Sequence, residues 1–162
     1  MTSKEKILSA LEAQCAKREY CSADIRRKAM DRCEGDAAMA QEIVASLLTN
    51  RFVDDSRYAS AFAREKASLT GWGPIKIRFA LRAKGLSEAD ISAGLEDVDQ
   101  EAASTRLSRL LEAKWKTLSD DPQGRLKLIR FALSRGYDYS AVESAVNEIT
   151  KKMYLCKTSQ TI

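Results

Sequence analysis

The chain has 162 residues, of which 27 are Lys or Arg and 23 are Asp or Glu, so its net charge is +4 at neutral pH. A hydrophobic content of 44% and a charged content of 31% are typical of a folded globular chain, and a chain of this length buries roughly 70% of its unfolded surface. Seven glycines and two prolines are too few for the many tight turns of a β-sandwich or β-barrel.

Histidine is absent from the sequence, which excludes catalytic centres built on an imidazole base and zinc sites ligated by histidine. The cysteines form no C-x-x-C pair, so the sequence supports neither a zinc ribbon nor a thioredoxin-type site, and we expect no metal and no cofactor. The first residues do not resemble a signal peptide, so we expect none, and no stretch approaches the roughly 20 apolar residues of a membrane span. We therefore expect a cytoplasmic protein, away from membranes, in which four cysteines are reduced and small: Cys15, Cys21, Cys33 and Cys156.

Apolar periodicity and capping residues predict a series of helices. The first runs from Ser3 to about Arg18, the second begins at Ser22 and ends at Gly35, and the third is capped by Asp36. The next helix begins at Asp54 or Asp55, and we expect its inward face to carry Tyr58, Ala59, Phe62 and Leu69.

The second half of the chain has the same kinds of helix-capping and helix-ending residues. After Gly71-Trp72-Gly73, Pro74 suits the first position of a helix that ends at Gly85, with Ile75, Phe79 and Ala83 on one apolar stripe. Further helices are expected from a capping box at Ser87-x-x-Asp90, from about Asp99 to Leu118, from a cap-and-proline pair at Asp121-Pro122 to Gly136, and from a cap at Asp138. Residues 151–162 show no periodicity, and we expect a frayed tail there.

An internal repeat organises these elements. The tetrapeptide Arg-Phe-Ala-Leu occurs at 78–81 and again at 130–133, each time after a proline and before a basic residue, a glycine and a short capped helix. The first third has the same order in weaker form. A period near 50 residues predicts an all-α protein of three tandem three-helix repeats stacked into an elongated, curved body. We place the repeats at 1–53, 54–97 and 98–150, followed by the tail at 151–162.

Positive charge is concentrated on the middle helix of every repeat. No acidic residue lies between Pro74 and Gly85 or between Pro122 and Gly136. If the repeats are alike in space, these cations form a stripe suited to a polyanion or an acidic groove. The candidate binding residues of this basic stripe are Arg26, Arg27, Lys28, Arg32, Lys76, Arg78, Arg82, Lys84, Arg125, Lys127, Arg130 and Arg135.

A structural interpretation of the same cations stays open. They could be solvated and bridged to acids on neighbouring helices, or their aliphatic stems could cover apolar surface. Asp54-Asp55 and Asp120-Asp121 are interpreted as helix-start residues rather than metal ligands or an acid–base pair. Trp72 is expected to be a wedge between repeats or an exposed contact residue, and Phe79 and Phe131 to be core. No nucleophile–base pair can be assembled, so we expect no enzyme.

Several spaced motifs carry a family resemblance. Phe52-Val53-Asp54-Asp55-Ser56-Arg57-Tyr58-Ala59, Gly71-Trp72-Gly73-Pro74, Lys84-Gly85-Leu86 and Arg135-Gly136-Tyr137 resemble the bacterial RecX regulatory family over roughly residues 20–150. The resemblance implies three tandem three-helix repeats, no catalytic residues and a role in DNA repair, recombination and the SOS response. It implies that the partner is the RecA–single-stranded DNA filament, and that ATP hydrolysis, strand exchange and coprotease activity are inhibited. We expect a monomer.

Two other classes of function remain open. The chain could bind single- or double-stranded DNA directly, with its basic helices acting as the recognition helices of helix-turn-helix-like units. It could instead be a basic helical scaffold for an acidic protein unrelated to recombination. An enzyme would need unsuspected cysteine chemistry at Cys15, Cys21 or Cys33.

Overall fold

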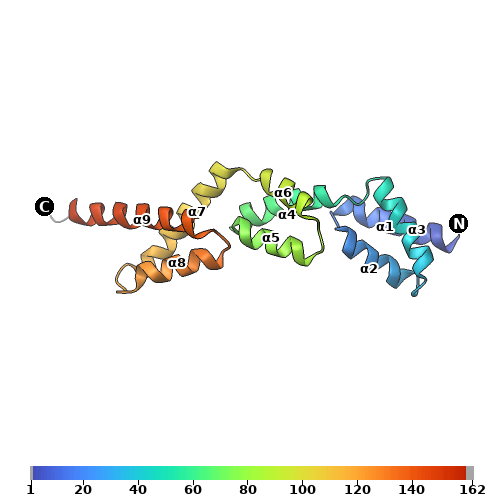
Figure 1. Ribbon diagram of the computed structural model, residues 1–162, viewed down its shortest axis with the longest axis horizontal. Helices are drawn as coiled ribbons and strands as arrows, with labels where there is room; N and C mark the ends of the chain where they lie inside the picture. The colour runs from blue at the N-terminus through green and yellow to red at the C-terminus, as the bar shows by residue number, and fades with distance from the viewer. Residues whose placement is uncertain (1, 160–162) are drawn as a thin grey trace. The chain divides into compact units, whose positions relative to one another are not determined.

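The protein is all-helical over residues 2–159, which are the residues that the computed structural model describes (Figure 1). Nine α-helices and no strand occur in this range, which confirms the predicted all-α fold built of three-helix repeats. The helices are α1 (Ser3–Lys17), α2 (Ser22–Arg32), α3 (Ala37–Thr49), α4 (Asp55–Leu69), α5 (Pro74–Ala83), α6 (Glu88–Glu96), α7 (Gln100–Leu118), α8 (Gly124–Ser134) and α9 (Tyr139–Ser159).

The chain divides into two compact units. The first unit comprises Met1–Phe62 with Ala80–Asp97, and the second comprises Ala63–Phe79 with Val98–Ile162. The first repeat that we expect from the sequence lies wholly in the first unit and the third repeat wholly in the second. The second repeat contributes to both, because the division falls within α4 and within α5.

Capping side chains start several helices where the sequence predicts. Asp36, Ser87, Asp99 and Asp138 each accept a hydrogen bond from the backbone N–H three residues later, at distances of 2.9–3.2 Å. Such a bond satisfies one of the N–H groups that the first turn of a helix leaves without a partner. Pro74 occupies the first position of α5, where its missing N–H costs no hydrogen bond.

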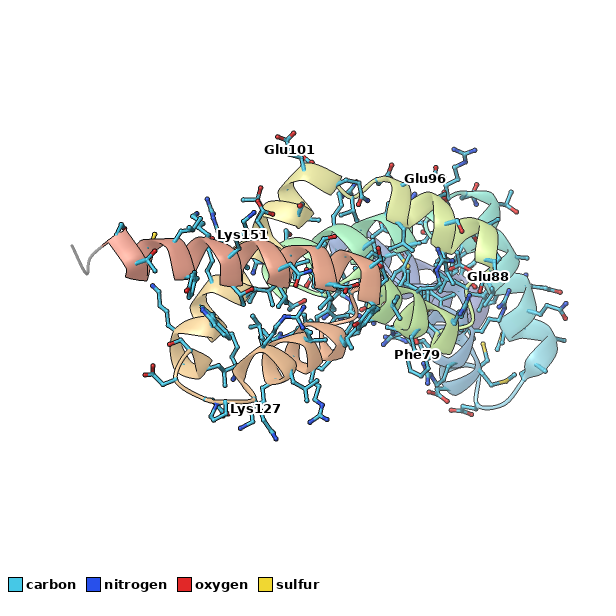
Figure 2. All side chains as sticks on the ribbon, turned by 60° about the vertical axis from the view of Figure 1, so that its left-hand side comes forward. Phe79, Glu88, Glu96, Glu101, Lys127 and Lys151 are labelled. Atoms are coloured by element: carbon cyan, nitrogen blue, oxygen red, sulfur yellow. The ribbon has the colours of Figure 1, made fainter. Side chains whose placement is uncertain are left out.

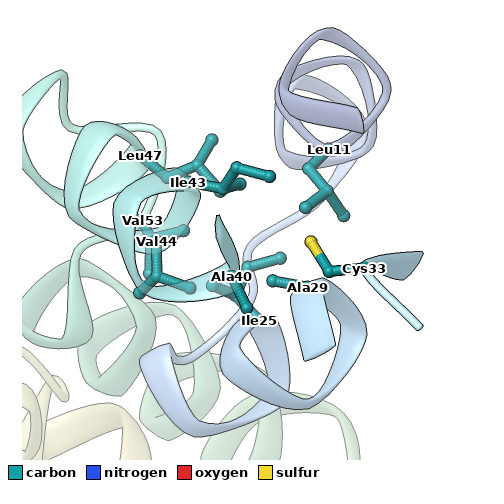
Figure 3. Close-up of a cluster of buried hydrophobic side chains, with 9 residues drawn as sticks. All are labelled: Leu11, Ile25, Ala29, Cys33, Ala40, Ile43, Val44, Leu47 and Val53. Atoms are coloured by element: carbon teal, nitrogen blue, oxygen red, sulfur yellow. The ribbon is translucent and has the colours of Figure 1, made fainter. Parts of the chain in front are cut away.

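The first repeat has its own apolar core (Figure 3). α1 contributes Leu11, which is fully buried, and α3 contributes the largest set of side chains. Two of the cysteines belong to this region, since Cys33 lies in the core and the half-buried Cys15 packs against it. The nine buried side chains are Leu11, Ile25, Ala29, Cys33, Ala40, Ile43, Val44, Leu47 and Val53.

A second core joins α7, α8 and α9 in the second unit. Its buried side chains recur at helical spacing along each of these three helices, so each helix presents one apolar face to the other two. Trp115 and Phe131 are half-buried at its edge. The core residues are Leu107, Leu111, Leu128, Ile129, Ala132, Tyr137, Val142, Val146 and Ile149.

The prediction that Phe79 and Leu69 face inwards is wrong. Phe79 is 74% exposed and Leu69 is 72% exposed. On α5 the buried residues are Ile77 and Leu81, so the face that packs inwards lies opposite the predicted stripe of Ile75 and Phe79. A helix with apolar residues on both sides presents two candidate inward faces, and periodicity alone does not choose between them.

Two boundaries also differ from the sequence predictions. α8 begins at Gly124 rather than at Pro122, because residues 119–123 form turns in which the Asp121 carboxylate accepts the Gln123 N–H at 2.8 Å. The C-terminal stretch is helical rather than frayed as far as Ser159, since α9 meets neither glycine nor proline after Asp138. Residues 160–162 of the predicted tail lie outside the described residues.

Candidate partner interface

The cations of α2 fall into paired and unpaired groups. Arg27 forms an ion pair with Asp24 one turn earlier, at 2.5 Å, and the Lys28 ammonium lies 5.3 Å from the ring centroid of Tyr20. Arg26 and Arg32 are exposed and make no hydrogen bond or ion pair within the described part of the chain. These two guanidinium groups are therefore available to an anionic partner.

Lys84, just after α5, lies in a polar cluster of the first unit. Its ammonium is 3.4 Å from the Asp24 carboxylate and 5.9 Å from the centroid of the Tyr58 ring. Burial by itself lowers the pKa of Lys84, but the interactions with Tyr58 and Asp24 outweigh it and leave that pKa raised. Lys84 is thus held as a cation by the protein's own groups.

The two central arginines of α5 are also engaged. Arg82 forms a two-pronged pair with Glu88 of α6, in which the second contact is 3.1 Å. The hydrogen bond from Arg82 to Glu88 raises the pKa of the Arg82 guanidinium above its ordinary value. Arg78 is half-buried and also has an interaction partner. Figure 2 labels Glu88, the acid that neutralises part of this helix.

Lys76 instead belongs to an aromatic group at the start of α5. Its ammonium lies 4.6 Å from the centroid of the Trp72 ring, and the Lys66 ammonium lies 4.9 Å from the same centroid. Both distances are within the range of cation–π attraction. Trp72 is half-buried, so its ring stabilises two positive charges at the surface of the second unit.

The cations of α8 differ in their contacts. Lys127, labelled in Figure 2, pairs with Asp121 at 2.5 Å, and Arg125 donates to the Asn147 side chain at 2.5 Å. The bond from Lys127 is the main cause of the lowered pKa of Asp121. Arg130 is exposed and has no hydrogen bond or ion pair among the described residues.

Arg135, just after α8, covers an aromatic ring. Its guanidinium carbon lies 5.3 Å from the Phe131 centroid, and the Lys114 ammonium lies at the same distance. Arg135 also donates to the Thr70 carbonyl at 3.4 Å. Acids therefore neutralise at least four members of the predicted basic stripe, Arg27, Arg82, Lys84 and Lys127, whereas Arg26, Arg32 and Arg130 have no acidic partner among the described residues.

The two aspartates at the start of α4 cap different helices. Asp54 accepts the Arg57 N–H at 3.1 Å and so caps its own helix. Asp55 accepts the backbone N–H of Ser22 at 2.7 Å and its hydroxyl at 2.6 Å. Because α2 has no side-chain cap at its own N-cap residue Cys21, Asp55 serves that helix from a distant part of the sequence.

The glycine-rich break before α5 joins the turn after α8. The N–H of Gly73 donates to the Arg135 carbonyl at 2.7 Å, and the N–H of Ile75 donates to the Gly136 carbonyl at 2.9 Å. A Cβ on Gly73 would lie 2.4 Å from the Gly136 oxygen, and one on Gly136 would lie 2.3 Å from the Lys76 Cβ. We call this contact, between residues 70–76 and 135–137, the glycine seam.

Profiles of known families match both later repeats. The description "RecX, second three-helix domain" matches residues 54–95, and "RecX, third three-helix domain" matches residues 101–146. A regulatory protein RecX from Haemophilus ducreyi is 30% identical over 122 residues, which cover 75% of this chain and 78% of that protein. The chain belongs to the RecX family.

Other RecX proteins are similar over a smaller part of their length. Regulatory protein RecX of Clostridium perfringens strain 13 is 34% identical over 107 residues, which cover 64% of this chain and 50% of that protein. That of Clostridium tetani is 27% identical over 118 residues, covering 70% and 54% respectively. The chain thus spans about half the length of these two relatives.

Solved structures of RecX proteins share the fold. The crystal structure of RecX from Lactobacillus salivarius matches with a TM-score of 0.78 and 17% identity, over 91% of this chain and 97% of that one. A second crystal structure, of a regulatory protein RecX, matches with a TM-score of 0.79 and 21% identity, over 90% and 72% of the two chains. At these identities the likeness establishes the fold.

Four residues of the motifs that resemble the RecX family have structural roles in this chain. Asp54 and Asp55 cap helices, and Gly73 and Gly136 belong to the glycine seam. The sequence did not indicate the seam, because a requirement for glycine reveals nothing about which distant backbone lies against it. Within residues 2–159 no group of three or more Cys, Asp or Glu side chains is placed to hold a metal ion, and no helix has the length and apolar character of a membrane span.

Proposed function

We propose that this RecX-family protein binds the filament that the RecA recombinase forms on single-stranded DNA and inhibits the filament's ATP hydrolysis, strand exchange and coprotease activity. Membership of a family of regulatory proteins is the observation that carries the proposal. Filament grooves lined by phosphates and carboxylates attract positive charge. Three exposed cations that have no partner within the described part of the chain support such an attraction: Arg26 and Arg32 on α2, and Arg130 on α8.

Binding through several weak contacts fits a chain of linked three-helix repeats. Once one repeat is bound, the contact of the next becomes intramolecular, so affinity increases without a deep pocket. Contacts to neighbouring recombinase subunits would restrain the movements that hydrolysis and strand exchange require. The chain acts in this proposal as a ligand of the filament and contributes no catalytic group.

The decisive measurement is the DNA-dependent ATPase of the recombinase from the same organism, titrated with this protein. We expect inhibition at well below one copy per recombinase subunit, together with shorter filaments in electron micrographs. Unchanged hydrolysis and unchanged filament length would contradict the proposal. Tight, sequence-selective binding to naked duplex DNA without the recombinase would favour the helix-turn-helix alternative instead.

A further inference from the structure

α5 exposes two apolar side chains on one side of the second unit. Ile75 is 55% exposed and Phe79 is 74% exposed. Residues four apart lie on the same face of a helix, so the two side chains are neighbours. Figure 2 marks Phe79 on α5. We call these two residues the α5 apolar pair.

The exposure of Phe79 is particular to the second repeat. The same tetrapeptide in the third repeat contains Phe131, which is half-buried and has Lys114 and Arg135 each 5.3 Å from its ring centroid. The repeated sequence by itself does not leave the aromatic ring uncovered. Phe79 therefore differs from Phe131 through its surroundings in the fold, and Ile75 has Lys127 at the corresponding position of the third repeat.

The beginning of α5 is held in a fixed position. The Ile75 N–H donates to the Gly136 carbonyl at 2.9 Å, and the adjacent Gly73 N–H donates to the Arg135 carbonyl at 2.7 Å. Gly136 also packs so closely on Lys76 that no side chain fits between them. The α5 apolar pair is thus presented on an ordered helix, and little conformational freedom remains to be lost when a partner binds.

The charge around the pair indicates the chemistry of the partner. α5 carries no acidic residue, and Lys76, next to Ile75 in the sequence, contacts the Trp72 ring and pairs with no acid among the described residues. An apolar helix face of this kind inserts into a groove on another protein, with anchors spaced four residues apart. Single-stranded DNA is a poorer match, because bases stack on aromatic rings and Ile75 offers none. Complementarity therefore favours an apolar protein groove with carboxylates at its rim.

We infer that Ile75 and Phe79 anchor this protein in an apolar groove with an acidic rim on the recombinase subunits of the filament, rather than on its DNA. This inference rests on the proposed function and deepens it. In this inference the charged residues guide the protein to the filament and orient it there. The two apolar side chains then slow its dissociation.

The test compares two double substitutions. Ile75→Ala with Phe79→Ala removes the α5 apolar pair, and Leu126→Ala with Leu133→Ala removes two exposed apolar side chains of α8, which are 45% and 39% exposed. Binding of each variant to recombinase filaments on single-stranded DNA is measured over a salt series, with the bare oligonucleotide as a second probe. We expect the α5 variant to bind filaments at least about tenfold more weakly with an unchanged salt slope, and the α8 variant to stay within about twofold of the parent.

A third variant checks the chemistry of the anchor. Phe79→Met keeps an apolar side chain of similar reach, so it should retain most of the filament affinity. Equal binding of the parent and the α5 variant to filaments overturns the inference and leaves the proposed function intact. An equal loss of binding to the bare oligonucleotide also overturns it, because the pair would then read DNA. If the parent protein itself does not bind filaments, both the proposed function and the inference fail.

Discussion

Asp55, at the start of α4, accepts two hydrogen bonds from Ser22, at the start of α2. One comes from the backbone N–H at 2.7 Å and the other from the hydroxyl at 2.6 Å. The two residues are 33 positions apart in the sequence, and Ser22 is buried. The N-terminus of α2 therefore takes its capping carboxylate from the following repeat.

Replacing Asp55 by Ala should lower the free energy of unfolding by about 1 to 3 kcal/mol, because a buried N–H loses a charged acceptor. Asp54→Ala, which removes an ordinary helix cap, should cost about 1 kcal/mol. Urea unfolding followed by circular dichroism would measure both changes in the free energy of unfolding. A double-mutant cycle with Ser22→Ala should give a coupling of about 0.5 to 1.5 kcal/mol for Asp55 and none for Asp54. Equal coupling for both aspartates would contradict the capping assignment.

The glycine seam predicts that Gly73→Ala is more harmful than an alanine at an open turn. Its Cβ would meet backbone atoms of Gly136 and Tyr137 at 2.4–2.6 Å, and backbone cannot move aside as a flexible side chain can. We expect a loss of about 2 to 3 kcal/mol in unfolding free energy. Gly85→Ala is the control, because Gly85 has open space around it and a φ of +82°; it should cost about 1 to 2 kcal/mol. Calorimetric melting of the two variants measures both losses, and a larger loss of stability for Gly85→Ala than for Gly73→Ala would contradict the prediction.

Asp24 makes stability depend on pH in acid. Burial tends to raise the pKa of this carboxyl, but the hydrogen bond from Cys21 and the charges of Lys84 and Arg27 outweigh burial and hold the pKa below its ordinary value of 3.8. A carboxyl with a lowered folded pKa stabilises the protein fully above the unfolded value and loses that contribution as pH falls through the folded pKa.

The corresponding variant is Asp24→Asn. It should be less stable than the parent at about pH 6 and should lose less stability than the parent between about pH 5 and pH 2. Urea midpoints measured across this range give the comparison. Parallel pH profiles for parent and variant would show that Asp24 does not contribute to acid unfolding.

Arg130 and Lys127 offer a test of which cations reach the partner. Both are exposed on α8, but Lys127 pairs with Asp121 and Arg130 has no ion pair among the described residues. Arg130→Gln should therefore weaken filament binding several-fold at low salt, and the difference should shrink as salt increases. Lys127→Gln should have the smaller effect, because its charge is already compensated. Fluorescence anisotropy with labelled filaments measures both, and an equal loss would contradict the distinction.

Removing residues 151–162 should leave the fold intact. Ile149 is the last residue of the apolar core around α7, α8 and α9, and the described side chains from Lys151 to Ser159 are exposed. Truncation after Thr150 should change the free energy of unfolding by less than about 1 kcal/mol. A loss of several kcal/mol in chemical denaturation would show that this stretch contributes to packing.

The sequence predicted helix starts better than helix faces. A cap is a local interaction, so Asp36, Ser87 and Asp138 could be recognised from the few residues that follow each of them. Which side of α5 is buried depends on elements distant in sequence, so its apolar stripe wrongly predicts Phe79 to be a core residue, although Phe79 is 74% exposed.

The sequence predicts which basic residues the candidate interface contains, but not which of their charges are neutralised by acids. Basic residues on the middle helices are visible in the sequence. The acids that neutralise them are placed by the fold: Glu88 reaches Arg82 from the next helix, and Asp24 reaches Lys84 from the preceding repeat. Net charge per helix therefore overstates the positive surface, and only the contacts show that Arg26, Arg32 and Arg130 have no acidic partner among the described residues.

The glycine seam has a consequence for chimeric proteins. The backbone of residues 73–75 donates to that of 135–136, so the two loops must fit each other in length and conformation. Transplanting a C-terminal repeat from another species would break this fit unless the donor's 70–76 segment came with it. Libraries of chimeric proteins should accordingly take both stretches from the same parent protein, with the crossover points placed outside them.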